Sequence, residues 1–279
     1  MLNLILAVLT GGSVSIVLRM SKGHAKNDMT LFAVNYVICF LLARAFMGKT
    51  TLIVHEEGIQ FALAAGIFAG AFYLINFILL QNSMKHNGVV LSSTFMKLGV
   101  LVPTLLAVTV FGEQPSLIQC LGFAIAVVGI ILIHFEKDST GNSTHKFLLI
   151  ILLLVAGFTD SMANFYDKIG NPDLKDHYLF YVFVAAFIIA TIAAIIRKEK
   201  PCIQDAIWGV LVGIPNYLSA RFLLLSLGSV PAMITYPVYS VGSIILITLA
   251  GVLLFKEKLS KQKMLALLFV VISLVLLNM

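Results

Sequence analysis

Apolar runs long enough to cross a lipid bilayer recur along the whole sequence. Such runs of about 20 residues, nearly free of charge, are typical of transmembrane helices. Within lipid, a helix satisfies its backbone N–H and C=O groups inside one segment. Of the 279 residues, 60% are hydrophobic and 11% are charged, whereas a soluble domain carries about 25% charged residues. The sequence therefore predicts an all-α, polytopic membrane protein with ten transmembrane helices, at residues 2–18, 30–47, 59–80, 89–111, 117–135, 147–165, 178–196, 207–226, 232–254 and 264–278.

One of these spans occurs twice. Residues Val89–Glu113 and Met233–Glu257 follow the same pattern 144 positions apart, and both end in an aromatic residue, one further residue and a glutamate. The two glutamates, Glu113 and Glu257, are expected to place negative charge at the N-terminus of the following helix. Their symmetry indicates a role in the frame of the protein.

The duplication extends over the chain. At the same offset the third to fifth spans match the eighth to tenth, and the first span matches the sixth at an offset near 146. The sequence thus predicts one membrane domain of two five-helix repeats, 1–135 and 145–279, joined at 136–144. Because five is an odd number, the second repeat must enter the membrane inverted. Inverted repeats with a substrate site between them are a common plan for secondary transporters.

Basic residues in the loops predict the orientation, since cytoplasmic loops are enriched in lysine and arginine. Loops after odd-numbered spans hold most of these residues, which predicts that these loops are cytoplasmic and that both termini lie outside. The net charge of +6 is therefore expected to serve topology and not nucleic-acid binding. Short loops favour the cell (plasma or inner) membrane as the location. Loops after even-numbered spans hold Arg44, Lys49, Lys168 and Lys175.

Three ionisable residues fall well inside predicted spans: Lys97, Asp160 and Arg221. Each costs about 2.5–3.5 kcal/mol at a helix centre, and such residues usually face a bundle interior or a water-filled cavity. None has a charged counterpart in the other repeat, and Lys97 falls on Val241. This asymmetry favours binding or coupling over a role in the frame. Alternatively, Lys97 extends its amine to the membrane surface, or Arg221 and Asp160 form a buried salt bridge.

Polar side chains share helix faces with these charges, because residues three and four apart are neighbours on a helix. As a set they predict one polar chamber, although singly such residues often hydrogen-bond between packed membrane helices. No catalytic or metal-binding pattern is found. The predicted substrate-binding residues are Lys97, Arg221, Asp160, Ser93, Thr94, Tyr73, Asn76, Asn164, Tyr217, Tyr236, Tyr239 and Ser240.

Two segments carry a resemblance to a known family, VTVFGEQPSLIQCLGFAIAVVGIILI (108–133) and AGVLLFKEKLSKQKMLALLFVVISLVLL (250–277). With these, the chain resembles the ten-helix EamA-type permeases of the drug/metabolite transporter superfamily. The resemblance implies inverted five-helix bundles, a central cavity and alternating access. Many members have cytoplasmic termini, opposite to the orientation that the loop charges predict. Related small multidrug exporters use a glutamate in the first helix, which this chain lacks, whereas Lys97 and Arg221 are similar in kind to the cations of phosphate-sugar translocators.

The favoured function is a secondary transporter, without ATP hydrolysis or a cofactor, for a small polar metabolite that is anionic. Lys97 would be the main anion contact and Arg221 a second contact or a gate. Asp160 is a candidate site for a coupling proton, because burial favours the neutral form of a carboxyl group. Membrane lipid is an expected partner and a homodimer a candidate assembly. The alternatives are an exporter of amino acids or amphipathic drugs, and an intramembrane lipid-modifying enzyme, although G-x-S-x-G and H-E-x-x-H motifs are absent.

Overall fold

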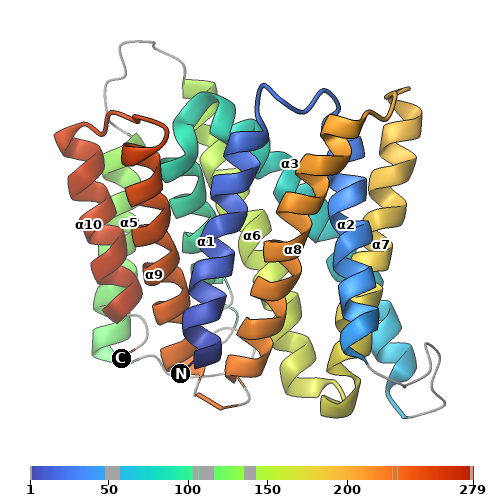
Figure 1. Cartoon of the computed structure of the whole chain (residues 1–279). Coiled ribbons are helices and arrows are strands. Elements are labelled where there is room, and N and C mark those ends of the chain that lie inside the picture. Colours follow the sequence, from blue (N-terminus) through green and yellow to red (C-terminus); the bar gives the residue numbers. More distant parts are fainter. Residues whose placement is uncertain are drawn as a thin grey trace. The chain divides into compact units, whose positions relative to one another are not determined.

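The computed structural model describes residues 2–47, 57–102, 106, 116–134, 143–227, 229–230, 232–276 and 279. These residues form α-helices and two short 3₁₀ turns (Figure 1). The elements are α1 (Leu2–Ser21), α2 (Asp28–Phe46), α3 (Ile59–Lys97), η1 (Leu98–Val100), α5 (Leu117–His134), α6 (Ser143–Ile169), η2 (Pro172–Leu174), α7 (Lys175–Ile196), α8 (Ile203–Leu227), α9 (Ala232–Leu253) and α10 (Lys261–Leu276).

The all-helical prediction is confirmed for the described residues. Among these described residues, five helical stretches are long and apolar enough to cross a membrane. The predicted count of ten helices is not confirmed, because nine α-helices are described, and α3 contains the third predicted span together with the start of the fourth, residues 89–97. That helix is broken inside: Gly88 has φ 79° and ψ 169°, which is not a helical conformation. Glycine adopts such a positive φ without the steric penalty that a side chain would bring.

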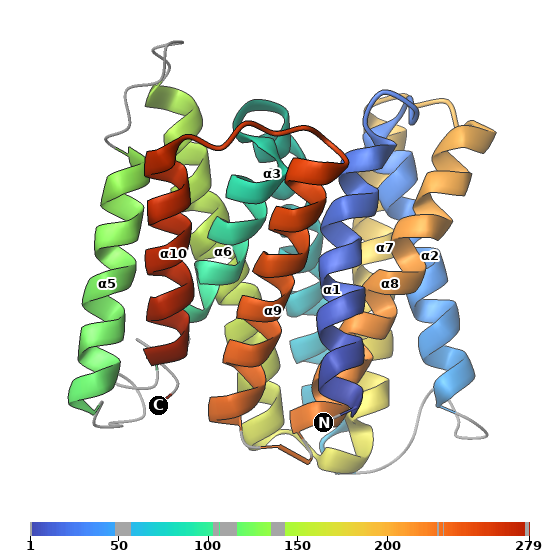
Figure 2. The ribbon, with the colours of Figure 1, turned by 60° about the vertical axis from the view of Figure 1, so that its left-hand side comes forward.

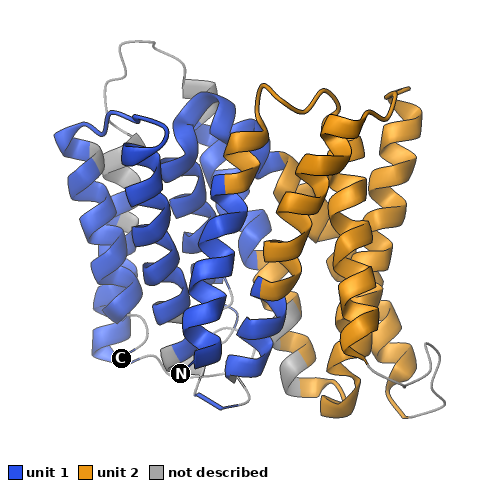
Figure 3. Ribbon diagram, in the orientation of Figure 1, with its two compact units in different colours: residues 1–16, 79–157, 219–279 blue, residues 17–78, 158–218 orange. Residues whose placement is uncertain are grey.

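The chain divides into two compact units, and each draws on both sequence halves (Figure 3). Unit 1 comprises Met1–Ile16, Leu79–Gly157 and Ser219–Met279, and unit 2 comprises Val17–Ile78 and Phe158–Leu218. The points at which the chain passes between units recur with a nearly constant spacing: 157 follows 16 by 141 positions, and 218 follows 78 by 140.

Unit 1 is built around helices that come from opposite ends of the sequence. Helices α5 and α10 pack side by side (Figures 1 and 2). The apolar core of this unit joins the end of α3 and η1 to α5, α6, α9 and α10. Its buried members include Phe95, Leu98, Leu101, Leu153, Ile244, Val270 and Leu274.

Unit 2 is built around the pair formed by α2 and α7. Glycines allow close helix contacts here, as their small-xxx-small spacing suggests. A Cβ atom at Gly213 of α8 would lie 2.7 Å from the carbonyl oxygen of Asn35 on α2. A Cβ atom at Gly70 of α3 would lie 2.8 Å from the Cβ of Ala185 on α7. The third helix of each half therefore packs on the second helix of the other half.

Candidate functional site

Lys97 occupies a break in a membrane helix. It is the last residue of α3, and the 3₁₀ turn η1 follows directly. A 3₁₀ stretch within a longer helical segment often marks a functional hinge. Four residues beyond Gly99 the sequence has Pro103, which has no N–H to donate to the carbonyl of Gly99. The local sequence thus disfavours a regular helix immediately after Lys97.

The amine of Lys97 lies over an aromatic ring. Its Nζ is 3.7 Å from the centre of the Tyr239 ring on α9, although the Lys97 residue is only 8% exposed. The phenol oxygen of Tyr239 is 3.0 Å from Oγ of Ser219 on α8. Gly11 of α1 closes this arrangement, because a Cβ atom there would lie 2.6 Å from the phenol oxygen and 2.9 Å from Oγ of Ser219. Four helical segments of unit 1 therefore meet around the ring.

The charge of Lys97 is stabilised by the ring and not by an ion pair within the described part of the chain, where no carboxylate lies within pairing distance of Nζ. A cation over an aromatic face gains about 0.5–2 kcal/mol. Burying a lysine at a helix centre costs about 2.5–3.5 kcal/mol. The contact with Tyr239 thus offsets part of the cost of burial.

Buried hydroxyls accompany Lys97. Within the described residues, Oγ of Ser93 on α3 and Oγ of Ser243 on α9 are buried and make no hydrogen bond. Thr94 instead donates to the carbonyl of Val90, at 2.7 Å, so its hydroxyl hydrogen is used inside its own helix. Ser240 is buried on α9. Two hydroxyls with unused hydrogen-bonding capacity are therefore available in the same unit as the cation.

Further predicted residues are divided between the units. Arg221 on α8 belongs to unit 1 and is half-buried, whereas Asp160 on α6 belongs to unit 2 and is also half-buried. Asn164 and Tyr236 lie on α6 and α9, and their side chains fall outside the described part of the structure.

Tyr73 and Tyr217 lie in the aromatic core of unit 2. Both rings pack against Phe183 of α7, with ring centres 5.8 Å and 6.0 Å away. Asn76 lies one turn from Tyr73 on α3, and its Oδ1 is buried without a hydrogen bond from any described residue. The structure therefore places these three predicted residues in the other unit from Lys97.

Gly11 and Ser219, which lie against Tyr239, and Ser243, whose hydroxyl is buried on α9, were absent from the predicted set. Ser243 lies on the same polar stripe of α9 as Ser240, so helical spacing could have included it. Ser219 and Gly11 carry no comparable signal. Serines and glycines are common in membrane helices, and the contacts that these two make depend on tertiary packing.

A carboxylate holds the start of the helical segment that bears Lys97. Oε1 of Glu257 accepts the backbone N–H of Val89 at 2.6 Å, and Oε2 accepts that of Val90 at 3.2 Å. The first N–H groups of a helix have no partner within the helix. The prediction that Glu257 serves the helix after it was wrong, because it serves the segment after Gly88. Glu113, its match in the first half, lies outside the described residues.

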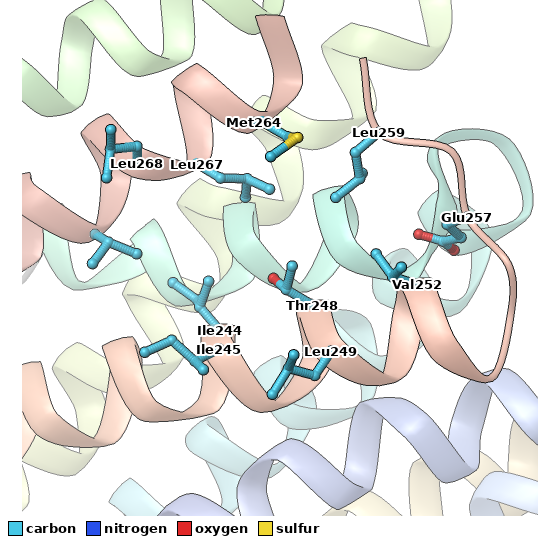
Figure 4. A pocket seen from close by; sticks show the side chains of 11 residues that line it. Ile244, Ile245, Thr248, Leu249, Val252, Glu257, Leu259, Met264, Leu267 and Leu268 are labelled. Carbon is cyan, nitrogen blue, oxygen red and sulfur yellow. The ribbon is translucent and has the colours of Figure 1, made fainter. Parts of the chain in front are cut away.

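An apolar groove of about 530 Å³ runs between α9 and α10 (Figure 4). Its lining is almost wholly aliphatic, with Thr248 and the carboxylate of Glu257 as polar members. None of the predicted substrate-binding residues is among its described lining. A small polar anion has no cationic partner there, so the groove does not fit the predicted substrate.

Among the described residues, five helical stretches are long and apolar enough to cross a membrane, which indicates an integral membrane protein. Residues 1–135 match the EamA-like transporter family, and residues 177–270 match the Small Multidrug Resistance protein family. Together the two matches support a permease of the drug/metabolite transporter superfamily.

Two further proteins are similar to this chain over nearly its whole length. An uncharacterized protein from Haemophilus influenzae is 25% identical over 281 residues, which span 96% of this chain and 94% of that protein. A protein of known crystal structure is 14% identical, with a TM-score of 0.67 over 99% of this chain and 95% of that one. The second similarity concerns the fold.

Proposed function

We propose that this permease is a secondary transporter that moves a small polar anion, a carboxylate or phosphate compound, across the membrane. The observation that carries the proposal is the environment of Lys97. Its amine is buried against the ring of Tyr239 and pairs with no carboxylate of the described residues. A negatively charged substrate would complete its coordination, and the unpaired hydroxyls of Ser93 and Ser243 would bind further polar groups.

The remaining predicted residues have proposed roles around this contact. Arg221 is a second anion contact or a gate, and Asp160 is the site of a coupling proton. Tyrosines and amides, among them Tyr73, Asn76 and Asn164, orient polar groups of the substrate as the cavity changes its opening.

The transport cycle that we propose is alternating access between two inverted five-helix repeats. Contacts that recur in both halves support this proposal. Gly209 and Gly213 of α8 contact α2, whereas Gly66 and Gly70 of α3 contact α7. The pairs of packed helices, α2 with α7 and α5 with α10, each join helices at corresponding places in the two halves. We place the protein in the cell membrane, with the lysine-rich loops after odd-numbered spans in the cytoplasm.

A thermal-shift screen of the purified protein tests the substrate class. Metabolites would be grouped by charge and applied to the wild type, Lys97→Met and Lys261→Met, the last of which removes an exposed lysine. A ligand that binds the native state raises the melting temperature by mass action. We expect anions to stabilise the wild type and Lys261→Met, and to lose this effect in Lys97→Met. Equal stabilisation of all three proteins by anions would overturn the role of Lys97.

Export of amphipathic drugs or amino acids is a second candidate. The Small Multidrug Resistance match over residues 177–270 and the aliphatic groove with its one carboxylate favour it. In the same screen, stabilisation by cationic amphiphiles and not by anions would support this candidate over the anion transporter.

A further inference from the structure

Two lysine–glutamate pairs adopt the same unusual backbone geometry at the ends of two helices. Lys198 follows α7 with φ 55°, and Lys256 follows α9 with φ 53°. Among the described residues, these are the non-glycine residues with a positive φ. Such a left-handed residue is common just after a helix, where it turns the chain back. The next residue in each case is a glutamate, whose backbone N–H still donates to its own helix, Glu199 to Ala194 and Glu257 to Gly251, both at 3.0 Å.

Each glutamate then accepts hydrogen bonds from two successive N–H groups at the start of a helix from the other half of the sequence. In unit 1, Glu257 accepts from Val89 and Val90. In unit 2, Glu199 accepts from Met29 at 3.3 Å and from Thr30 at 2.8 Å. A carboxylate at a helix N-terminus also interacts favourably with the helix dipole. The hydrogen-bonding arrangement is therefore the same in the two units, but the helical segment whose start is held differs.

The segment held by Glu257 carries Lys97. Val90 and Lys97 are seven residues, or about two helical turns, apart. Glu257 itself follows α9, the helix that carries Tyr239, and its own N–H donates to the carbonyl of Gly251 at 3.0 Å. The lysine and the ring that it lies against are thus on two segments that one side chain ties together.

The start of the Lys97 segment needs such a tie because the chain is broken there. Gly88 interrupts the helical conformation of α3, so the segment from Val89 onward does not continue the helix before it. A Cβ atom at Gly88 would lie 2.9 Å from Oε1 of Glu257, so the glutamate fills the space that a side chain would need. A hydrogen bond of 2.8 Å between Ser83 and Ser92 crosses the same break.

We propose that Glu257 is a positioning residue that holds Lys97 against Tyr239, whereas Glu199 performs a structural task by the same geometry. The further step, in which the positioned amine binds an anionic substrate, rests on the proposed function. The positioning itself does not, so the two can fail separately.

The test measures the position of Lys97 directly, without a substrate. Purified wild type, Glu257→Gln and Glu199→Gln would be treated with formaldehyde and borohydride, and methylation of Lys97 followed by mass spectrometry, with exposed Lys261 as the internal reference. An amide presents one oxygen and an N–H₂ group where the carboxylate presented two acceptors. We expect Glu257→Gln to raise the Lys97 methylation rate at least fivefold relative to Lys261. Glu199→Gln should leave it within twofold.

Two further measurements separate positioning from a general loss of stability. Melting temperatures should fall by similar amounts in the two glutamine variants, and Glu257→Asp, which keeps the charge, should restore at least half of the change in the Lys97 rate. An unchanged Lys97 rate in Glu257→Gln, or an equal rise in both glutamine variants, would overturn the proposal. If Glu257→Gln does not fold, Gly88→Ala takes its place, because the added Cβ would lie 2.9 Å from Oε1 of Glu257 and displace the carboxylate. A Lys97 rate within twofold of the wild type in Gly88→Ala would then overturn the proposal. Lys97→Met assayed for anion stabilisation tests the transport function independently of these results.

Discussion

At two places in unit 1, a glycine lets two helical segments pass close to each other, and we call these places crossings. The two glycines occupy matching positions in the two sequence halves, but the groups that they face differ in polarity. At the first, Gly11 of α1 faces the phenol of Tyr239 and the hydroxyl of Ser219. At the second, Gly157 of α6 faces the carbonyl oxygen of Gly99 and the side chain of Val102. Gly157 follows Gly11 by 146 positions. Both crossings bring helices close together, but polar side chains surround the glycine in the first of them.

The difference shows how a duplicated frame can carry an unduplicated site. Lys97 lies two residues before Gly99, so the segment that makes the apolar crossing also extends the amine to the ring at the polar crossing. In the second half the position that corresponds to Lys97 is Val241. Close packing is thus retained twice, and an aromatic residue stands at both corresponding positions, Tyr239 and Phe95, whereas the lysine and the phenol hydroxyl occur once.

The largest effect is expected from Lys97→Met. Methionine keeps the length of the side chain and removes the charge, so the variant should fold while transport of the anion that best stabilises the wild type falls at least 100-fold. A loss of this size corresponds to about 2.7 kcal/mol, near the cost of burying a lysine that the substrate is expected to offset. Uptake into proteoliposomes measures it, with Lys261→Met as the control. Transport within threefold of the wild type would remove Lys97 from the site.

At the apolar crossing, Gly157→Ala should act on stability. The added methyl group would meet a backbone carbonyl and a branched side chain, neither of which can move without shifting its helix. Overpacking of this kind typically costs about 1–3 kcal/mol. The melting temperature of the purified variant in detergent should therefore fall by several degrees. An unchanged melting temperature would show that the two helical segments can move apart here at little cost in stability.

The sequence predicted the positions of the described helices well, because apolar length is a property that each segment carries by itself. Apolar length determined the spans, and the observed helices begin and end near the expected residues. The break at Gly88 blurred the boundary between the third and fourth spans, since the helix before it runs on through Gln81–Asn87, a stretch too polar to have been counted as part of a span. Likewise, α6 begins at Ser143, inside the stretch expected to join the repeats.

The site was predicted in part, for reasons that are also physical. A lysine in the middle of an apolar run is conspicuous because its burial is costly. Tyr239 entered the predicted set because it lies beside a polar stripe of the ninth span. Contacts between segments that are distant in the sequence produce no comparable sequence pattern. Two such sets of contacts depend on how the helices pack. Tyr239 lies against Ser219 and Gly11, and Glu257 accepts hydrogen bonds from Val89 and Val90. The assignment of Arg221 and Asp160 to binding or coupling stays a prediction.

At the polar crossing, Gly11→Ala should act on binding more than on stability. The added methyl group would meet the end of the Tyr239 side chain, 2.6 Å from its oxygen, and a side chain can turn away where a backbone cannot. The ring would then move relative to Lys97. We expect the affinity for the stabilising anion to fall about tenfold, or 1.4 kcal/mol, with a smaller loss of melting temperature than in Gly157→Ala. Titration calorimetry and thermal melting of both variants test this contrast, and equal behaviour of the two would contradict it.

The smallest effect is expected from Tyr239→Phe, which divides the polar crossing into its two components. Phenylalanine keeps the aromatic face over which the amine of Lys97 lies and removes the hydrogen bond with Ser219. A single neutral hydrogen bond contributes about 0.5–1.5 kcal/mol, so anion affinity should fall by a factor of about two to ten. Tyr239→Leu removes the ring as well and should weaken anion binding further, because the buried amine then loses its aromatic contact. If Tyr239→Phe and Tyr239→Leu bind the anion equally well, the ring does not support Lys97, and the polar crossing differs from the apolar one by its hydroxyl groups alone.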